Sequence, residues 1–222
     1  MSEIARTGLR EDPHALGHRR HGHAHESSGH GEGGPASKRI VVAYGFWIFL
    51  LSDIVMFSAF FAAYAVLAKH TAGGPSGREL FETPRVALET ACLLASSFTC
   101  GLGNVASVQR NMVWTQVWLL ITGLLGAAFL ALEAQEFVQM VADGNSPQRS
   151  AFLSAFFAVV GCHGLHVSGG LLWLGTMMAQ IWVKGFRPDI MRRMFCFNLF
   201  WHALDIIWVA LFTIVYLIGA GP

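Results

Sequence analysis

Five long apolar stretches constrain the fold of this chain more than any other feature of its sequence. A membrane-spanning helix needs about 20 predominantly apolar residues, and five segments reach that length: 40–68, 86–108, 113–142, 151–183 and 194–219. Hydrophobic residues make up 54% of the 222 residues and charged residues only 13%, which argues against a soluble globular protein. We therefore predict an all-α fold, an integral membrane bundle of five transmembrane helices.

The distribution of lysine and arginine predicts how this bundle crosses the membrane. If the amino terminus is cytoplasmic, 11 of the 15 basic residues fall on the cytoplasmic side, and only Lys69, Arg78, Arg85 and Arg149 fall on the other. Cytoplasmic loops of membrane proteins carry such an excess of positive charge. We therefore expect a cytoplasmic amino terminus and a periplasmic carboxyl terminus.

The chain divides into two parts at the start of the first apolar stretch. Residues 1–39 are hydrophilic and rich in histidine, glycine and arginine, and they contain no apolar segment of the kind found in a cleaved signal peptide. Such a composition cannot bury a core, so we expect a disordered, His-rich cytoplasmic tail, with weak metal binding by its histidines as the alternative. Residues 40–219 form the predicted transmembrane domain.

The apolar stretches contain few ionisable residues, and these are the candidates for function. Placing an acidic or basic side chain at the bilayer centre costs roughly 2.5 to 3.5 kcal/mol, so each of these residues should face protein or water rather than lipid. Counting about 1.5 Å per residue along each helix places the three glutamates in the outer half and the others near the midplane. We expect them to form a polar cluster with a structural or proton-related role: Asp53, Glu89, Glu133, Glu136, His163, His166, His202 and Asp205.

The segment GCHGLHVSGG (161–170) allows several interpretations. A haem with two axial histidines needs them on opposite faces of the ring, which His163 and His166 on one helix cannot supply. The pair also lacks the glutamate of the zinc motif H-E-x-x-H. A proton relay remains open, and a structural pairing of both imidazoles with a carboxylate, Glu136 or Asp53, is the interpretation we favour. Nearby glycines should allow the helices to approach closely.

Four segments carry a resemblance to a known family: YGFWIFLLSDIVMFSAFFAAYAVL, LEAQEFVQMVADG, SAFFAVVGCHGLHVSGGLLWL and FWHALDIIWVALFTIVYL. Together, and in this order, they resemble subunit III of the haem-copper terminal oxidases. The larger members of that family have seven helices. A chain with five helices, the loop TAGGPSG and a His-rich leader is similar to the branch found in cytochrome bo-type ubiquinol oxidases.

The resemblance implies an accessory subunit in a bacterial inner membrane, with no catalytic residue, metal or cofactor of its own. Haems and copper would belong to the catalytic subunit I, the partner that oxidises ubiquinol, reduces oxygen to water and pumps protons. This chain would contact subunit I, other subunits and membrane phospholipids, but no nucleic acid, and would support assembly, stability and proton uptake. Asp53 matches the family's intramembrane carboxylate, where many relatives carry glutamate. The alternatives are subunit III of a cytochrome c oxidase, an independent membrane transporter, and an enzyme with its own redox cofactor.

Overall fold

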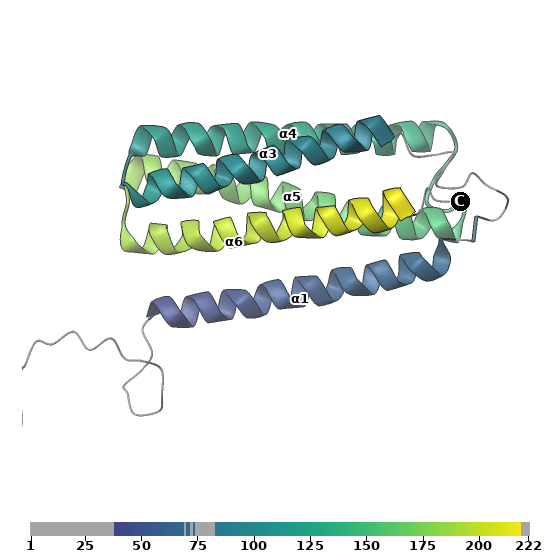
Figure 1. Ribbon diagram of the computed structural model, residues 1–222, viewed down its shortest axis with the longest axis horizontal. Helices are drawn as coiled ribbons and strands as arrows, with labels where there is room; N and C mark the ends of the chain where they lie inside the picture. The colour runs from purple at the N-terminus through teal and green to yellow at the C-terminus, as the bar shows by residue number, and fades with distance from the viewer. Residues whose placement is uncertain (1–37, 69, 72, 74–82, 219–222) are drawn as a thin grey trace, which may run out of the picture. The chain divides into compact units, whose positions relative to one another are not determined.

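The computed structural model describes residues 38–68, 70–71, 73 and 83–218, and its secondary structure within these ranges is helical (Figure 1). Five helices are long and apolar enough to cross a membrane, which confirms the predicted all-α fold with five spans. In chain order the elements are α1 Lys38–Leu67, α3 Thr83–Val108, α4 Met112–Ala142, α5 Ala151–Lys184, α6 Pro188–Leu211 and the π-helix η1 Phe212–Ile218.

The predicted His-rich tail lies outside the described residues up to position 37, and most of the loop TAGGPSG lies outside them as well. The last two residues assigned to the tail already belong to the first turn of α1. Ser37–Pro222 forms one compact unit.

Local sequence signals explain where the helices begin and end. The side chains of Asn111 and Ser150 accept hydrogen bonds from the backbone N–H groups of Trp114 and Leu153 and so cap α4 and α5. Gly185, with φ of 66°, ends α5 in a conformation that favours glycine. The last helix begins at Pro188 rather than at 194 as expected, because proline at the first helical position needs no hydrogen-bond donor.

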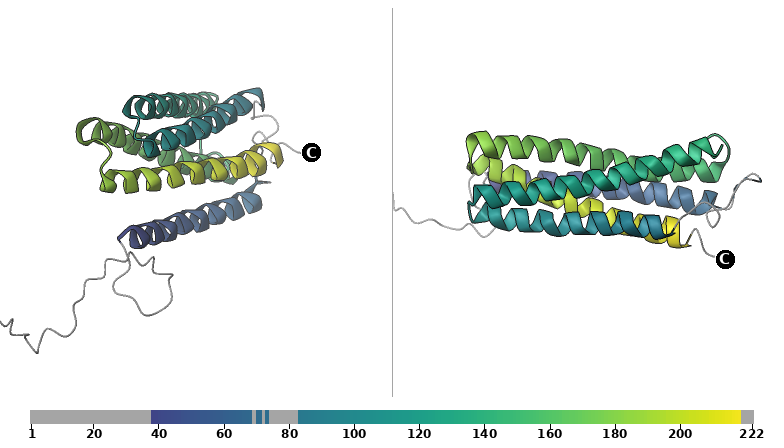
Figure 2. Two further views of the ribbon diagram at one scale, coloured as in Figure 1. Left: turned by 60° about the vertical axis from the view of Figure 1, so that its left-hand side comes forward. Right: turned by 90° about the horizontal axis from the view of Figure 1, so that it is seen from above.

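The helices run side by side along a common direction (Figures 1 and 2). The α3 and α4 helices pack along each other, α5 packs against α4 and α6, and α6 also contacts α3. The first helix, α1, contacts α5 and α6. It does so through Leu50, Phe57 and Tyr64, which recur every seven residues and are buried, whereas most of its other apolar side chains are exposed. A seven-residue repeat keeps one seam of a helix against its neighbour.

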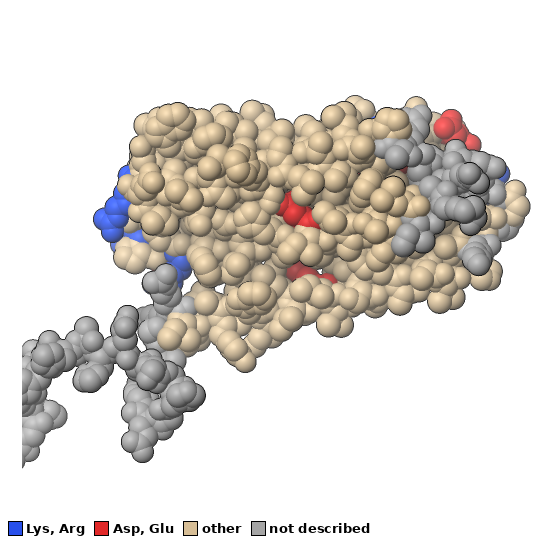
Figure 3. Space-filling view, in the orientation of Figure 1, with Lys and Arg blue, Asp and Glu red and all other residues tan. Residues whose placement is uncertain are grey.

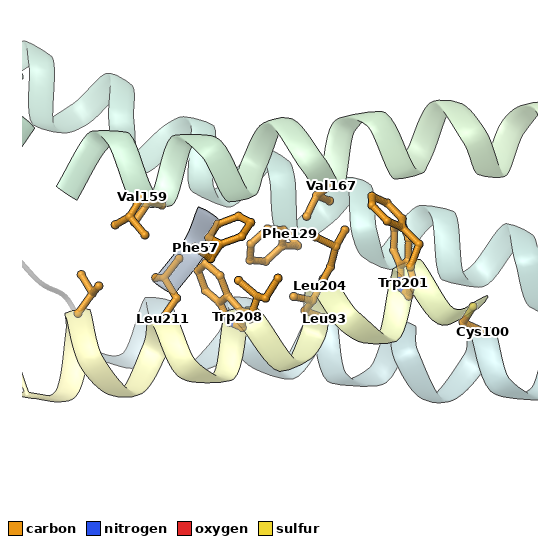
Figure 4. Close-up of a cluster of buried hydrophobic side chains, with 14 of the residues drawn as sticks. Phe57, Leu93, Cys100, Phe129, Val159, Val167, Trp201, Leu204, Trp208 and Leu211 are labelled. Carbon is orange, nitrogen blue, oxygen red and sulfur yellow. The ribbon is translucent and has the colours of Figure 1, made fainter. Parts of the chain in front are cut away.

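Large aromatic side chains from several helices meet in the core (Figure 4). Phe129 of α4 lies edge-on to Trp208 of α6, with ring centroids 4.6 Å apart. Phe57 of α1 and Leu93 of α3 belong to the same buried cluster. Close packing of this kind supplies the attraction between helices in lipid, where burial of apolar surface provides little drive.

Gly126 of α4 and Gly170 of α5 make room for a side chain rather than for close backbone contact. A methyl group on Gly126 of α4 would lie 3.0 Å from Cη2 of Trp201, and one on Gly170 of α5 would lie 2.9 Å from Cζ3 of the same indole. The Trp201 N–H donates to the Ser96 hydroxyl of α3 at 3.1 Å. This one α6 side chain is therefore held by three other helices.

Candidate functional site

The three glutamates of the apolar helices meet in one buried group. Glu89 of α3 and Glu133 and Glu136 of α4 are at most 6% exposed. They lie close enough for each to act electrostatically on the others. Because Glu133 and Glu136 are three residues apart, they share a face of α4. We call Glu89, Glu133 and Glu136 the glutamate group.

Two residues outside the eight predicted ones, Arg85 and Tyr216, bind this group. The Arg85 Nε lies 3.9 Å from Oε1 of Glu89, and its Nη1 and Nη2 donate to the Gln139 side chain at 2.9 Å and to the Leu132 carbonyl at 3.1 Å. The Tyr216 hydroxyl donates to Oε2 of Glu136 at 3.2 Å.

The predicted second apolar stretch starts at residue 86 and so excludes Arg85, whereas α3 begins at Thr83 and places Arg85 one turn before Glu89. A basic residue just before an apolar stretch, four positions ahead of a glutamate, is the signal that could have found it. Tyr216 lies on η1, and no local pattern distinguishes it from an interfacial tyrosine.

Gly164 of α5 provides the space for Glu133. A methyl group added to this glycine would lie 2.8 Å from Oε1 and 3.1 Å from Oε2 of Glu133. Neither oxygen of Glu133 has a hydrogen-bond partner among the described residues. The glycine between the two histidines therefore makes room for a carboxylate on the neighbouring helix, which gives the H-G-L-H segment a packing role.

His163 lies in the aromatic core and is fully buried. Its Nε2 donates to the Leu204 carbonyl of α6 at 3.4 Å. Its ring lies 5.1 Å from that of Trp208 and 5.7 Å from that of Phe129 between centroids. Among the described residues Nδ1 has no hydrogen-bond partner. His163 thus joins α5 to α6 from within the bundle.

His166 faces α1 instead of the core and is half-buried. Its Nδ1 donates to the Cys162 carbonyl at 2.7 Å, and its ring lies 5.3 Å from that of Phe57. Asp53 of α1, also half-buried, is near enough to interact with it electrostatically. Asp53 of α1 and His166 of α5 thus form a polar contact between these two helices.

The predicted pairing of both imidazoles with a carboxylate does not take the form of a direct hydrogen bond among the described residues. In the part of the chain that the structure describes, neither His163 nor His166 makes an ion pair or hydrogen bond with Glu136 or Asp53. Residues three apart on a helix differ by about 60° in direction. That difference turns His163 into the core and His166 towards α1, so the two rings have different surroundings.

A third polar group lies between α3 and α6. The Ser97 hydroxyl is 2.5 Å from Nδ1 of His202, and Asp205 lies beside the same hydroxyl. Asp205 is 6% exposed, and neither of its oxygens meets a hydrogen-bond partner among the described residues. The eight ionisable residues therefore lie in separate groups: the glutamate group, Asp53 with His166, His163 in the aromatic core, and His202 with Asp205. Within the described ranges, no three His, Cys, Asp or Glu side chains converge as metal ligands would.

Comparison with known proteins matches this chain to a family over most of its length. The family profile described as "Cytochrome c oxidase subunit III" matches residues 22–220. The chain is 50% identical to the cytochrome bo(3) ubiquinol oxidase subunit 3 of Pseudomonas aeruginosa, over 94% of each chain. It is 43% identical to the quinol oxidase subunit 3 of Bacillus subtilis, over 80% of this chain and 87% of that one.

A relative with a different name is also similar. The cytochrome c oxidase subunit 3 of Bacillus sp. strain PS3 is 42% identical, over 79% of this chain and 84% of that one. The five apolar helices, the profile match and the near full-length similarity agree, and this chain belongs to the cytochrome c oxidase subunit III family.

Proposed function

We propose that this chain is the non-catalytic subunit III of a cytochrome bo-type ubiquinol oxidase in a bacterial cytoplasmic membrane. It associates with the catalytic subunit I, which holds the haems and copper and reduces oxygen to water. The observation that carries this proposal is the 50% identity with a ubiquinol oxidase subunit 3 over 94% of both chains. Identity with the relative named as a cytochrome c oxidase subunit is lower, at 42% over 79% of this chain, which favours ubiquinol as the electron donor of the complex.

The buried polar groups support a role in assembly and stability. Each group joins two or more helices: the glutamate group joins α3, α4 and, through Tyr216, η1, and Ser97 with His202 joins α3 to α6. A buried polar network with specific partners restricts the helices to one rotation and one register. Such a rigid bundle offers the catalytic subunit a defined surface.

Asp53 and His166 support a contribution to proton uptake. They are half-buried, so protons and partner side chains can reach them, whereas the glutamate group is enclosed. A proton can transfer between a carboxylate and an adjacent imidazole.

The proposed orientation, with a cytoplasmic amino terminus and a periplasmic carboxyl terminus, follows from the distribution of lysine and arginine between the two sides of the bundle. Phospholipids occupy the grooves of the bundle in this proposal.

Purification through a tag on the full-length chain tests the association. We expect a haem-containing subunit to co-purify in mild detergent, and the complex to consume oxygen with ubiquinol but not with reduced cytochrome c. A strain that lacks this chain should retain the haem spectrum of subunit I but yield less assembled oxidase.

Other outcomes would reject the proposal. Failure to recover a haem protein would show that the chain is not an oxidase subunit. Oxygen consumption with reduced cytochrome c but not with ubiquinol would assign the chain to a cytochrome c oxidase. A Soret band from the separated chain would reveal a redox centre of its own. Alkaline phosphatase fused to the carboxyl terminus should be active if that terminus is periplasmic, and inactivity would reverse the orientation.

A further inference from the structure

The side chains that α3 and α6 leave exposed follow a seven-residue repeat on each helix. On α6 the repeat consists of Phe195, His202 and Val209, of which the two apolar residues are exposed and His202 is half-buried. On α3, Phe98 and Val105 are exposed at the same spacing. A seven-residue repeat keeps one seam of a helix against a neighbouring helix, and the buried repeat of α1 does so within this bundle. The repeats of α3 and α6 have no such neighbour among the described helices.

These repeats form one surface, because α6 contacts α3 and the contact between Ser97 and His202 places them at the same level. We call this surface the α3–α6 seam, and it consists of Leu94, Phe98, Gly101 and Val105 of α3 and Phe195, His202, Ile206 and Val209 of α6. Figure 3 shows the bundle from the side on which α3 and α6 lie, and basic side chains are visible there only at the two ends. The seam is therefore a long and mostly apolar surface.

His202 is the polar residue in the middle of this seam. It is the fifteenth residue of α6, about 21 Å along the helix, in a span of 30 residues, and so lies near the midplane of a bilayer. The Ser97 hydroxyl occupies its Nδ1 at 2.5 Å. The Nε2 atom has no hydrogen-bond partner among the described residues and is not enclosed by them. Lipid tails cannot supply a partner to a polar atom at this depth.

A transmembrane helix would complete both the apolar and the polar part of the seam. Acyl chains would cover the apolar side chains but leave Nε2 of His202 without a hydrogen bond. Gly101 leaves room for a helix to approach, since a methyl group there would meet nothing within 4 Å. A single polar residue within a seven-residue repeat fixes the partner of a helix and its register.

The partner side chain opposite His202 should be polar and uncharged. A hydroxyl or carboxamide group can both donate and accept, so it fits whichever tautomer of His202 is bound to Ser97. A charged side chain would be costly to hold at this depth in the partner helix before the two helices met.

We propose that the α3–α6 seam binds one transmembrane helix of another oxidase subunit, with His202 hydrogen-bonded to a hydroxyl or carboxamide side chain of that helix. The inference rests on the proposed function for the identity of the partner. It adds the surface that the partner occupies, the chemistry of the partner helix and the residue that fixes its register.

The test uses photocrosslinking in membranes that contain the full complex. Ile206→p-benzoylphenylalanine places the photoreactive group in the seam. Leu165→p-benzoylphenylalanine on α5 is the matched control, because Leu165 is 75% exposed, Ile206 is 72% exposed and both lie well inside their helices. After irradiation, mass spectrometry identifies the crosslinked peptides. We expect the group at position 206 to join a transmembrane segment of another oxidase subunit that has Ser, Thr, Asn or Gln near the crosslink, and the control not to join that segment.

Two pairs of variants test the role of the seam residues in this adduct. His202→Leu should lower the yield of the adduct about five-fold, whereas His202→Gln keeps a hydrogen-bonding side chain and should retain most of it. Gly101→Leu fills the seam but leaves His202 and Ser97 in place, and it should also lower the yield. Its control is Gly175→Leu on α5, where a methyl group would likewise meet nothing within 4 Å. This second pair keeps the test decisive if His202→Leu does not fold.

The proposal is overturned if the adducts at position 206 contain only lipid or a second copy of this chain. It is also overturned if His202→Leu and His202→Gln, or Gly101→Leu and Gly175→Leu, give equal yields. An adduct with a helix of a membrane protein that is not an oxidase subunit would support the seam and count against the proposed function alone. Haem recovered with the wild type reports the subunit role separately.

Discussion

Gly170→Ala should destabilise the bundle because it closes the slot that holds the Trp201 indole. The new methyl group would lie 2.9 Å from Cζ3 of Trp201 and 3.2 Å from Cε1 of Phe200. The indole is 1% exposed, and its N–H is bound to Ser96 at 3.1 Å. It cannot retreat towards α4, because Gly126 faces the other edge of the ring.

Gly169→Ala is the matched control for this substitution. Gly169 is exposed, and a methyl group there would meet nothing within 4 Å. Alanine is favoured over glycine within a helix by about 1 kcal/mol, and this gain is common to both variants. Overpacking of a close-packed site costs about 1–3 kcal/mol. We therefore expect Gly169→Ala to be as stable as the wild type or slightly more stable, and Gly170→Ala to lie about 1–3 kcal/mol below Gly169→Ala.

The free energy of unfolding of each variant can be measured by titration with SDS in mixed micelles, followed by tryptophan fluorescence. Adding Trp201→Phe to Gly170→Ala should recover part of the loss, since the smaller ring vacates the slot, and the double-mutant cycle then gives the coupling between the two residues. If the two alanine variants differ by less than about 0.5 kcal/mol, the indole is not confined between α4 and α5 and the packing argument is wrong.

Three further predictions concern the polar groups. Arg85→Gln should lower the free energy of unfolding by about 1–3 kcal/mol, because buried Glu89 loses its cation. Adding Glu89→Gln should restore most of the lost stability in the same SDS titration. Equal stability of the single and double variants would contradict the pairing of Arg85 with Glu89. Thr90→Val should cost a similar amount by leaving the Trp208 N–H, now 3.0 Å from the Thr90 hydroxyl, without an acceptor, whereas Thr90→Ser should be nearly neutral. Asp53→Asn should slow steady-state oxygen consumption by the complex without loss of bound haem, and an unchanged rate would remove this residue from proton uptake.

Several features could be predicted from the sequence because they depend on one helix at a time. Backbone groups in lipid must be satisfied within the segment, so a long apolar stretch has to form a helix. The expected sharing of a face by Glu133 and Glu136 has the same origin, since three residues make nearly one turn. The resemblance to subunit III rested on four segments in order, and the family match over residues 22–220 confirms it.

The features that could not be predicted depend on how one helix rotates against another. His163 points into the aromatic core and His166 towards Asp53 because α5 packs between α1, α4 and α6. Nothing in the spacing H-x-x-H distinguishes that outcome from a shared carboxylate. Arg85 lies outside the predicted second apolar stretch because its charge lowers the local hydropathy, although its long side chain reaches Glu89 of the glutamate group.

The sequence alone determined that this protein is a membrane bundle of five helices of the subunit III type, because length, hydropathy and ordered motifs are properties of the chain itself. Only the tertiary structure decided that Gly164 makes room for Glu133, that Gly126 and Gly170 enclose Trp201, and that Ser97 contacts His202. These contacts join residues far apart in the chain. They arise only when side-chain volumes on neighbouring helices are packed against one another, and no local pattern encodes that fit.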